Sequence, residues 1–157
     1  MSVGPAIALS VLLLGLNAFF VGAEFALISA RRSAIEPLAE EGGWAARIAL
    51  RAMENVSLMM AGAQLGITVC TLGLGVLGEP AIANVIEPGF EAAGLPEPLL
   101  HPLAFAIALS IVGLLHLVVG EMVPKNIALA RPDRSALILG PPLVFIVRVL
   151  HPAIWLL

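Results

Sequence analysis

Residues 103–126 read LAFAIALSIVGLLHLVVGEMVPKN, an apolar run that ends on a glycine, a carboxylate, a proline and a lysine. A helix that crosses a bilayer core about 30 Å thick needs roughly 20 apolar residues, and this run approaches that length. Pro124 has no backbone N–H, so it cannot donate to the carbonyl oxygen four residues earlier, at Gly120. The sequence therefore predicts a spanning helix that ends on a freed backbone oxygen beside the carboxylate of Glu121.

The composition of the whole chain indicates a membrane protein. Hydrophobic residues occupy 60% of the 157 positions and charged residues only 12%, which leaves too little polar surface for a soluble globule. Two more stretches, residues 6–30 and 56–77, approach spanning length. We expect an all-α membrane protein of one domain, residues 1–157, with transmembrane helices over about residues 5–30, 55–77 and 102–123.

The connecting segments predict smaller elements. Residues 33–53 read as short juxtamembrane helices, and the four prolines in residues 78–100 predict at most one or two short helices on the outer membrane surface. Residues 131–157 are apolar, but the best available charge-free run, 136–147, is too short to cross. We expect a belt helix in the cytoplasmic interface with Trp155 as an anchor. A proline-kinked fourth span is the alternative.

The basic residues indicate the orientation. They follow the first and third expected spans, and none occurs in residues 78–102. The positive-inside rule then places the N-terminus outside and both basic segments in the cytoplasm, in a multi-pass protein of the inner (plasma) membrane. The net charge of −3 gives no case for nucleic-acid binding. The basic residues are Arg31, Arg32, Arg47, Arg51, Lys125, Arg131, Arg134 and Arg148.

Polar residues inside the expected spans suggest a cation site. Asn17 and Glu24 are seven residues apart and share one helix face, as do Gln64, Thr68 and Thr71 in the second span. A charge at the centre of a spanning helix costs about 2.5 to 3.5 kcal/mol, so Glu24 should face the bundle interior. Hard cations such as Mg²⁺ prefer carboxylate and carbonyl oxygens.

Structural interpretations of the same residues remain open. Glu24 or Glu121 pairs with Lys125 or Arg31 in one alternative, and Asn17 serves only as a hydrogen bond between helices in another. His116 reads as a packing or hydrogen-bonding residue. Gly62 and Gly66 form a GxxxG pattern that predicts close helix packing, within the protomer or across a dimer. No catalytic motif occurs, so we expect no enzyme.

Five segments carry a resemblance to a known family. They are LNAFFVGAEFALISARRSAIEPL (16–38), AQLGIT (63–68), LGEPA (77–81), LHLVVGEMVPKNIALARP (115–132) and PAIWLL (152–157). Their order and spacing resemble the transmembrane domain of the CorC/HlyC/CNNM family. The resemblance implies three transmembrane helices with a cytoplasmic belt helix, a homodimer, and Mg²⁺ transport that is often Na⁺-coupled efflux. It also implies a cytoplasmic CBS-domain pair in the full-length protein, so the chain reads as an isolated membrane domain.

The family's cation site carries over only in part. Characterised members hold the cation with a Ser in the first helix, an Asn in the second and the Gly-Glu region of the third. Val21 and Ile67 occupy the first two positions here, and neither side chain binds a metal. Glu24, Gln64 and Thr68 occur nearby instead, and they either supply substitute oxygens or form a hydrated cavity; a cation other than Mg²⁺ is an alternative. We expect a Mg²⁺ transporter that works by alternating access. The expected metal ligands are Gly120, Glu121, Glu24, Gln64, Thr68 and Asn17, with Pro124, Lys125, Gly62 and Gly66 in structural or gating roles.

A second hypothesis comes from another functional class. In it the chain is a non-transporting membrane anchor or a cation sensor, and the polar residues only stabilise the bundle. The two hypotheses differ in whether Mg²⁺ crosses the membrane.

Overall fold

The computed structural model describes residues 3–155, apart from the side chains of Ala153 and Trp155, and all regular elements in that part are helices. The elements are α1 (Val3–Ser29), α2 (Arg32–Glu40), α3 (Trp44–Glu54), α4 (Val56–Ala92), α5 (Glu97–Leu115), the π-helix η1 (His116–Met122), α6 (Val123–Ala130) and α7 (Pro132–Trp155). Four stretches are long and apolar enough to cross a membrane: Val3–Ser29, Val56–Ala92, Glu97–Ala130 and Pro132–Pro152. An all-helical, multi-pass membrane protein is therefore confirmed.

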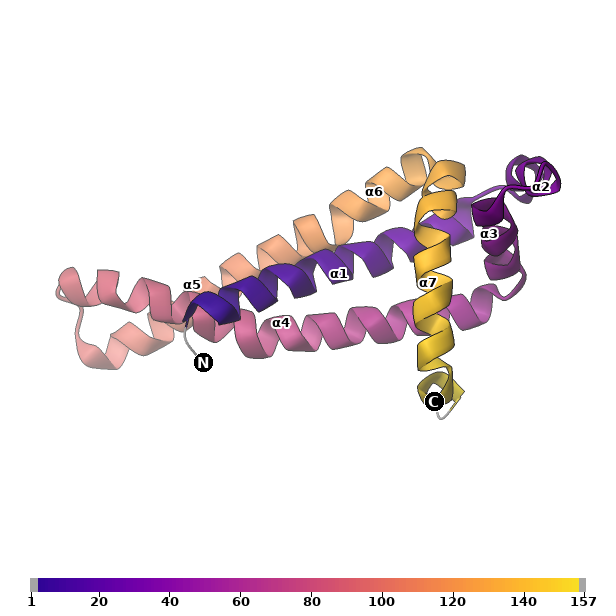
Figure 1. Ribbon diagram of the computed structural model, residues 1–157. Coiled ribbons are helices and arrows are strands. Elements are labelled where there is room, and N and C mark those ends of the chain that lie inside the picture. The colour runs from indigo at the N-terminus through magenta and orange to yellow at the C-terminus, as the bar shows by residue number, and fades with distance from the viewer. Residues whose placement is uncertain (1–2, 156–157) are drawn as a thin grey trace.

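The long helices run in two directions. Helices α1 and α4 and the continuous α5–η1–α6 rod lie side by side lengthwise, whereas α7 crosses them near one end (Figure 1). By length and composition α7 also qualifies as a span, so the argument that residues 131–157 are too short to cross is wrong. Its crosswise direction is what distinguishes α7 from the other three. The side chain of Trp155, the expected anchor, lies outside the described residues.

The expected outer segment takes a different form. Helix α4 continues through Pro80 and Pro88 to Ala92, and α5 begins four residues after the turn at Ala93, so the prediction of short surface helices over 78–100 is wrong. Both prolines are exposed, so the backbone hydrogen bonds that they remove lie at the surface, outside the packed core. The α4–α5 hairpin projects beyond the start of α1 (Figure 1).

Small residues let the helices approach closely. Gly66 of α4 faces the ring of Phe20 in α1, and a Cβ added there would lie 2.5 Å from the ring. Gly62, one turn earlier, faces Val147 of α7. The GxxxG pattern therefore serves packing inside the protomer. Alanines complete these contacts, and the fully buried ones include Ala23, Ala26, Ala63, Ala104 and Ala136.

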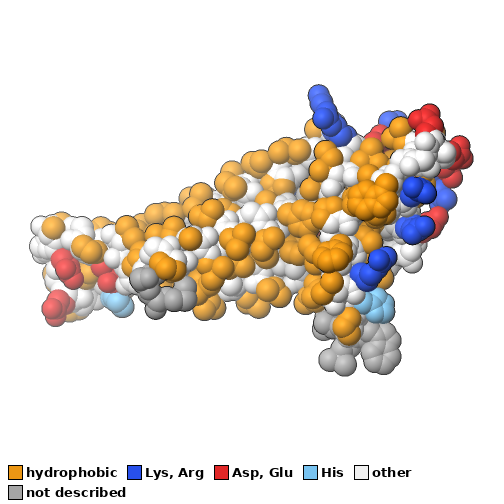
Figure 2. Space-filling model, viewed as in Figure 1, with side chains coloured by type: hydrophobic (Ala, Val, Ile, Leu, Met, Phe, Trp, Pro, Cys, Tyr) orange, Lys and Arg blue, Asp and Glu red, His pale blue; other side chains and the backbone are white. Residues whose placement is uncertain are grey.

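Charged side chains gather at the two ends of the molecule, and the face between them is apolar (Figure 2). At the basic end, the backbone N–H of Arg31 donates to Asp133 at 2.8 Å and the Arg31 guanidinium donates to the same carboxylate at 3.3 Å. Arg32 pairs with Glu54 at 3.4 Å. These contacts join the α1–α2 connection to α7, and α2 to α3, at the end where α7 crosses the bundle.

Candidate functional site

Asn17 of α1 lies fully buried against η1. Its amide Nδ2 donates to the carbonyl oxygen of Gly120 at 3.0 Å, and its Oδ1 has no hydrogen-bond partner in the described part of the chain. The bond to a carbonyl fixes which end of the amide is nitrogen. The sequence had predicted a Gly120 oxygen without a donor. That prediction is wrong, because Asn17 of α1 donates a hydrogen bond to this oxygen. A second hard oxygen, Asn17 Oδ1, is left buried without a donor.

The π-helix changes the expected geometry around Pro124. The third spanning helix was expected to end at about residue 123, but the helical chain continues from η1 directly into α6. The N–H of Val123 donates to the carbonyl of Val118, five residues earlier. The helix therefore continues through this wide turn, although Pro124 has no N–H to donate. π-helical turns occur frequently at functional sites.

His116 joins η1 to α4 and to Glu121. Its Nε2 lies 3.3 Å from Thr71 Oγ1 and 3.4 Å from Glu121 Oε1. Residues five apart point in different directions on an α-helix of 3.6 residues per turn, but a π-turn brings them close. The sequence interpretation treated His116 only as a packing or hydrogen-bonding residue. The contact between His116 and Glu121 depends on a π-turn, and no motif in the sequence predicted that turn.

Glu24 forms a second polar contact, two helical turns along α1 from Asn17. Glu24 is 6% exposed, and its carboxylate accepts both of its hydrogen bonds from Gln64 Nε2, at 2.9 and 3.1 Å. Gln64 is a neutral donor, and no Lys, Arg or His forms an ion pair with Glu24 among residues 3–155. The carboxylate is therefore buried inside the bundle without a cationic partner, which is costly for an ionised group.

Comparison with known proteins identifies the family. The family model of the cyclin M transmembrane N-terminal domain, CNNM, matches residues 8–157. The chain belongs to this family. The CNNM domain here is 51% identical over 154 residues to the uncharacterized protein Rv1841c of Mycobacterium tuberculosis, covering 98% of this chain and 44% of that protein. The suspected resemblance is thus confirmed.

Relatives of the CNNM domain occur in distant bacteria. The UPF0053 protein YhdT of Bacillus subtilis is 41% identical over 145 residues, which cover 92% of this chain and 32% of YhdT. The UPF0053 protein sll0260 of Synechocystis is 32% identical over 142 residues, covering 90% of this chain and 32% of the relative. The chain therefore spans less than half the length of these three relatives.

The structure brings the expected ligands of this CNNM domain together in two places. Asn17 meets Gly120, and Glu24 meets Gln64, about 10 Å apart along α1 at 1.5 Å per residue. The hydroxyl of Thr68 takes part in neither contact. It donates instead to the backbone carbonyl of Gln64, in its own helix, at 2.8 Å. Among the described residues, no three His, Cys, Asp or Glu side chains gather in a metal-binding group.

The alternative ion pairs are not formed in the described part of the chain. The ammonium of Lys125 lies 4.6 Å from the centre of the Phe25 ring, as a cation–π contact, and Arg31 pairs with Asp133. Glu24 is paired with the neutral amide of Gln64, and Glu121 lies beside His116. Neither carboxylate forms an ion pair with Lys125 or Arg31 among the described residues.

Proposed function

We propose that this CNNM domain moves Mg²⁺ across the membrane, with oxygens of α1, α4 and η1 as the path of the ion. The observation that carries the proposal is the buried carboxylate of Glu24, whose only described donor is the neutral amide of Gln64. A carboxylate inside a membrane bundle with no cationic partner attracts a cation. Membership of the family supports Mg²⁺ as that cation.

The chemistry of the donors suits a partly hydrated ion. Mg²⁺ keeps several of its waters and takes only one or two protein carboxylates. The path would then offer one carboxylate at each of two positions: Glu24 beside Gln64, and Glu121 next to Gly120 in η1. At the second position, Asn17 Oδ1 and the Gly120 carbonyl would accept hydrogen bonds from the waters of the ion or bind the ion directly. The unpartnered Asn17 Oδ1 supports this role, because a buried acceptor otherwise costs stability. Thr68 would contribute only through the free lone pairs of its hydroxyl.

Alternating access is the proposed mechanism, with Na⁺-coupled efflux as the direction that the family suggests. The Asn17–Gly120 bond closes the bundle across α1 and η1, so opening the path on one side would break this bond. The π-helix and Pro124 supply the irregular backbone at membrane depth on which transporters rely. Lys125, at the end of the same rod, would remain at the cytoplasmic boundary.

The proposed topology has three crossings with α7 as a cytoplasmic belt. The crosswise direction of α7 and the basic residues at the same end support it (Figures 1 and 2). The N-terminus would then lie outside the inner membrane. We also propose a homodimer, with lipid around it and a CBS-domain pair following in the full-length protein, as the family implies.

Flux in liposomes tests the proposal. Vesicles that contain the protein and a Mg²⁺-sensitive dye should show Mg²⁺ movement, and Glu24→Gln or Glu121→Gln should each reduce its rate at least tenfold. Glu97→Gln, in the first turn of α5 at the tip of the hairpin, is the matched control and should keep the rate. Equal rates for all four proteins would overturn the proposal.

A non-transporting anchor or cation sensor is the second candidate. It is favoured by the pairing of Gly120 with Asn17 and of Glu24 with Gln64, which lets the polar groups stabilise the bundle without an ion. Vesicles without Mg²⁺ flux, together with binding of Mg²⁺ to the protein, would support a sensor.

A further inference from the structure

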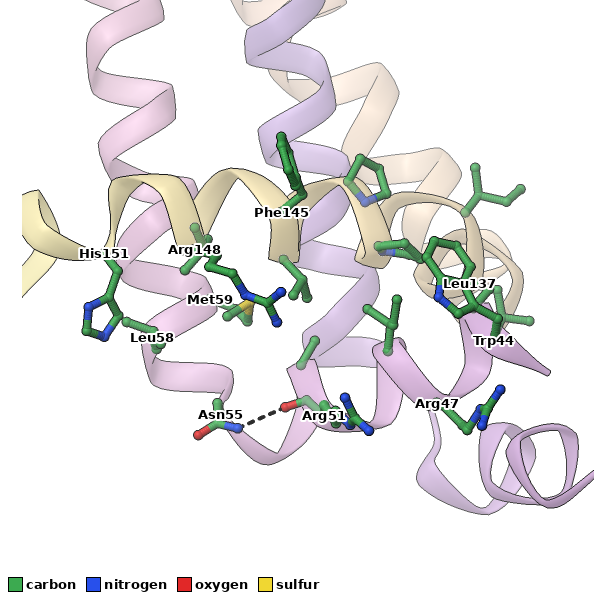
Figure 3. A pocket seen from close by; sticks show the side chains of 18 residues that line it. Trp44, Arg47, Arg51, Asn55, Leu58, Met59, Leu137, Phe145, Arg148 and His151 are labelled. Carbon is green, nitrogen blue, oxygen red and sulfur yellow. Dashed lines mark hydrogen bonds between the residues drawn. The ribbon is translucent and has the colours of Figure 1, made fainter. Parts of the chain in front are cut away.

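A groove of about 1120 Å³ lies at the basic end of the molecule, separate from the polar contacts of α1 (Figure 3). Helix α3, the start of α4 and the crossing helix α7 form its walls. Four of its lining residues are basic or titratable: Arg47, Arg51, Arg148 and His151. The proposed transport path uses none of them.

The arginines of the groove lack acidic partners in the described part of the chain. Arg32 and Arg31 form ion pairs nearby, but no carboxylate of residues 3–155 forms an ion pair within 4.0 Å of Arg51 or Arg148. Arg47 makes only a long bond of 3.4 Å to the carbonyl of Gly42. The groove therefore holds positive charge that a bound anion can neutralise, and guanidinium groups bind phosphate well because they present several N–H donors.

The apolar part of the groove lies on the side of the spans. Phe145 points along the bundle toward the spans, whereas Arg47 and Arg51 lie on the opposite side of α7 (Figure 3). Phe145 and Trp44 are 69% and 65% exposed, so the groove presents large apolar side chains to whatever lies beside it. The groove thus changes from apolar to basic along the bundle axis, as a phospholipid does from its acyl chains to its phosphate.

We propose that this groove binds an anionic phospholipid of the adjacent leaflet. The phosphodiester would lie between Arg51 and Arg148, Trp44 would lie at the headgroup level, and an acyl chain would pack on Phe145. Basic pockets beside membrane helices bind anionic headgroups, and tryptophan prefers the membrane–water boundary. An acidic protein segment would satisfy the arginines but would leave the exposed Phe145 uncovered, so the lipid accounts for more of the groove.

The two tryptophans of the chain allow a direct test. In a Trp155→Phe background, Trp44 is the single indole, and a brominated lipid beside it quenches its fluorescence. The protein in nonionic micelles is titrated with brominated phosphatidylglycerol or brominated phosphatidylcholine. Phosphatidylglycerol should quench at a mole fraction at least tenfold lower, because only it carries a net negative charge.

Charge removal locates the site. Arg51→Gln with Arg148→Gln should weaken the apparent affinity for phosphatidylglycerol roughly 30-fold, since each arginine near an anionic headgroup contributes to binding. Arg131→Gln with Arg134→Gln removes the same charge from exposed positions outside the groove and should leave the affinity within twofold. All four substituted side chains are exposed, so elution profile and thermal midpoint should match the unsubstituted protein.

Competitors identify the source of the phosphate. Inorganic phosphate at millimolar concentration and a glutamate-rich peptide should not reverse the quenching. Reversal by phosphate would show a free-anion site, and reversal by the peptide would show a protein-docking site, and either result overturns the lipid proposal. Equal quenching by the two lipids, or an unchanged affinity in the Arg51 and Arg148 variant, also overturns it.

Discussion

The side-chain amide of Asn17 donates to the carbonyl oxygen of Gly120, which joins the middle of α1 to a π-helix 103 residues later in the chain. This bond satisfies the carbonyl that lies four residues before Pro124, and it leaves the other end of the amide buried, with no hydrogen-bond partner among the described residues. Asn17 therefore contributes to the packing of the bundle and is also one of the proposed ion ligands. If the bond is a closed gate, weakening it should change both properties.

Asn17→Leu keeps the size of the side chain and removes its hydrogen bond. Hydrogen bonds between membrane helices contribute about 0.6 kcal/mol on average and up to about 1.7 kcal/mol, so we expect a loss of stability near the upper value because the Gly120 oxygen stays buried. The midpoint of unfolding in dodecyl sulfate measures it. Ser110→Ala, which removes an exposed hydroxyl bonded within its own helix, is the control and should be neutral. A neutral Asn17→Leu would mean that the bond adds nothing to stability.

Gly120→Ala should disturb the same contact by crowding. An added Cβ would lie 2.9 Å from His116 Cδ2, 3.0 Å from Asn17 Nδ2 and 3.1 Å from Leu14 Cδ1, so neighbouring atoms must move. Overpacking of this kind costs about 1 to 3 kcal/mol. Gly113→Ala is the matched control on the same rod, since nothing lies within 4 Å of its added Cβ. That control should be neutral or slightly stabilising, because alanine favours helix.

Gly66→Ala should separate α4 from α1. Its Cβ would meet the Phe20 ring at 2.5 Å, a contact that a helix backbone and a buried ring cannot relieve without moving apart. We expect about 1 to 3 kcal/mol of destabilisation in the same unfolding assay, with the oligomeric mass unchanged, because this contact lies inside the protomer. Gly75→Ala, with open space around it, should match the starting protein. A change of mass without a change of stability would instead place Gly66 at an interface between protomers.

Mg²⁺ should stabilise the folded protein if it binds between α1, α4 and η1. A ligand that binds only the folded state at 100 times its Kd adds about 2.7 kcal/mol, which raises the thermal midpoint. We expect a rise with Mg²⁺ that Glu24→Gln reduces by at least half and Glu97→Gln leaves intact. A flat midpoint across the Mg²⁺ series would contradict binding, and an equal rise in Glu24→Gln would exclude that carboxylate as a ligand.

Local features of the sequence were sufficient to predict the class of fold. Hydropathy and run length depend only on neighbouring residues, so the helices of α1, α4 and the α5–α6 rod were predictable, and so was the shared face of Asn17 and Glu24. Proline was a weaker guide. Pro80 and Pro88 do not end α4, because at exposed positions each removes only a surface hydrogen bond.

The partners of the polar residues were decided by tertiary structure alone. Asn17 reaches Gly120, Gln64 reaches Glu24, and His116 reaches Glu121 only because small residues bring the helices close and a π-turn rotates one of them. The crosswise direction of α7 likewise follows from its packing on α1, α3 and α4, not from its length or hydropathy. The Glu24–Gln64 and Asn17–Gly120 contacts join residues 40 and 103 positions apart, so they depend on how whole helices fit together. Composition and periodicity describe each helix separately and hold no information on that fit.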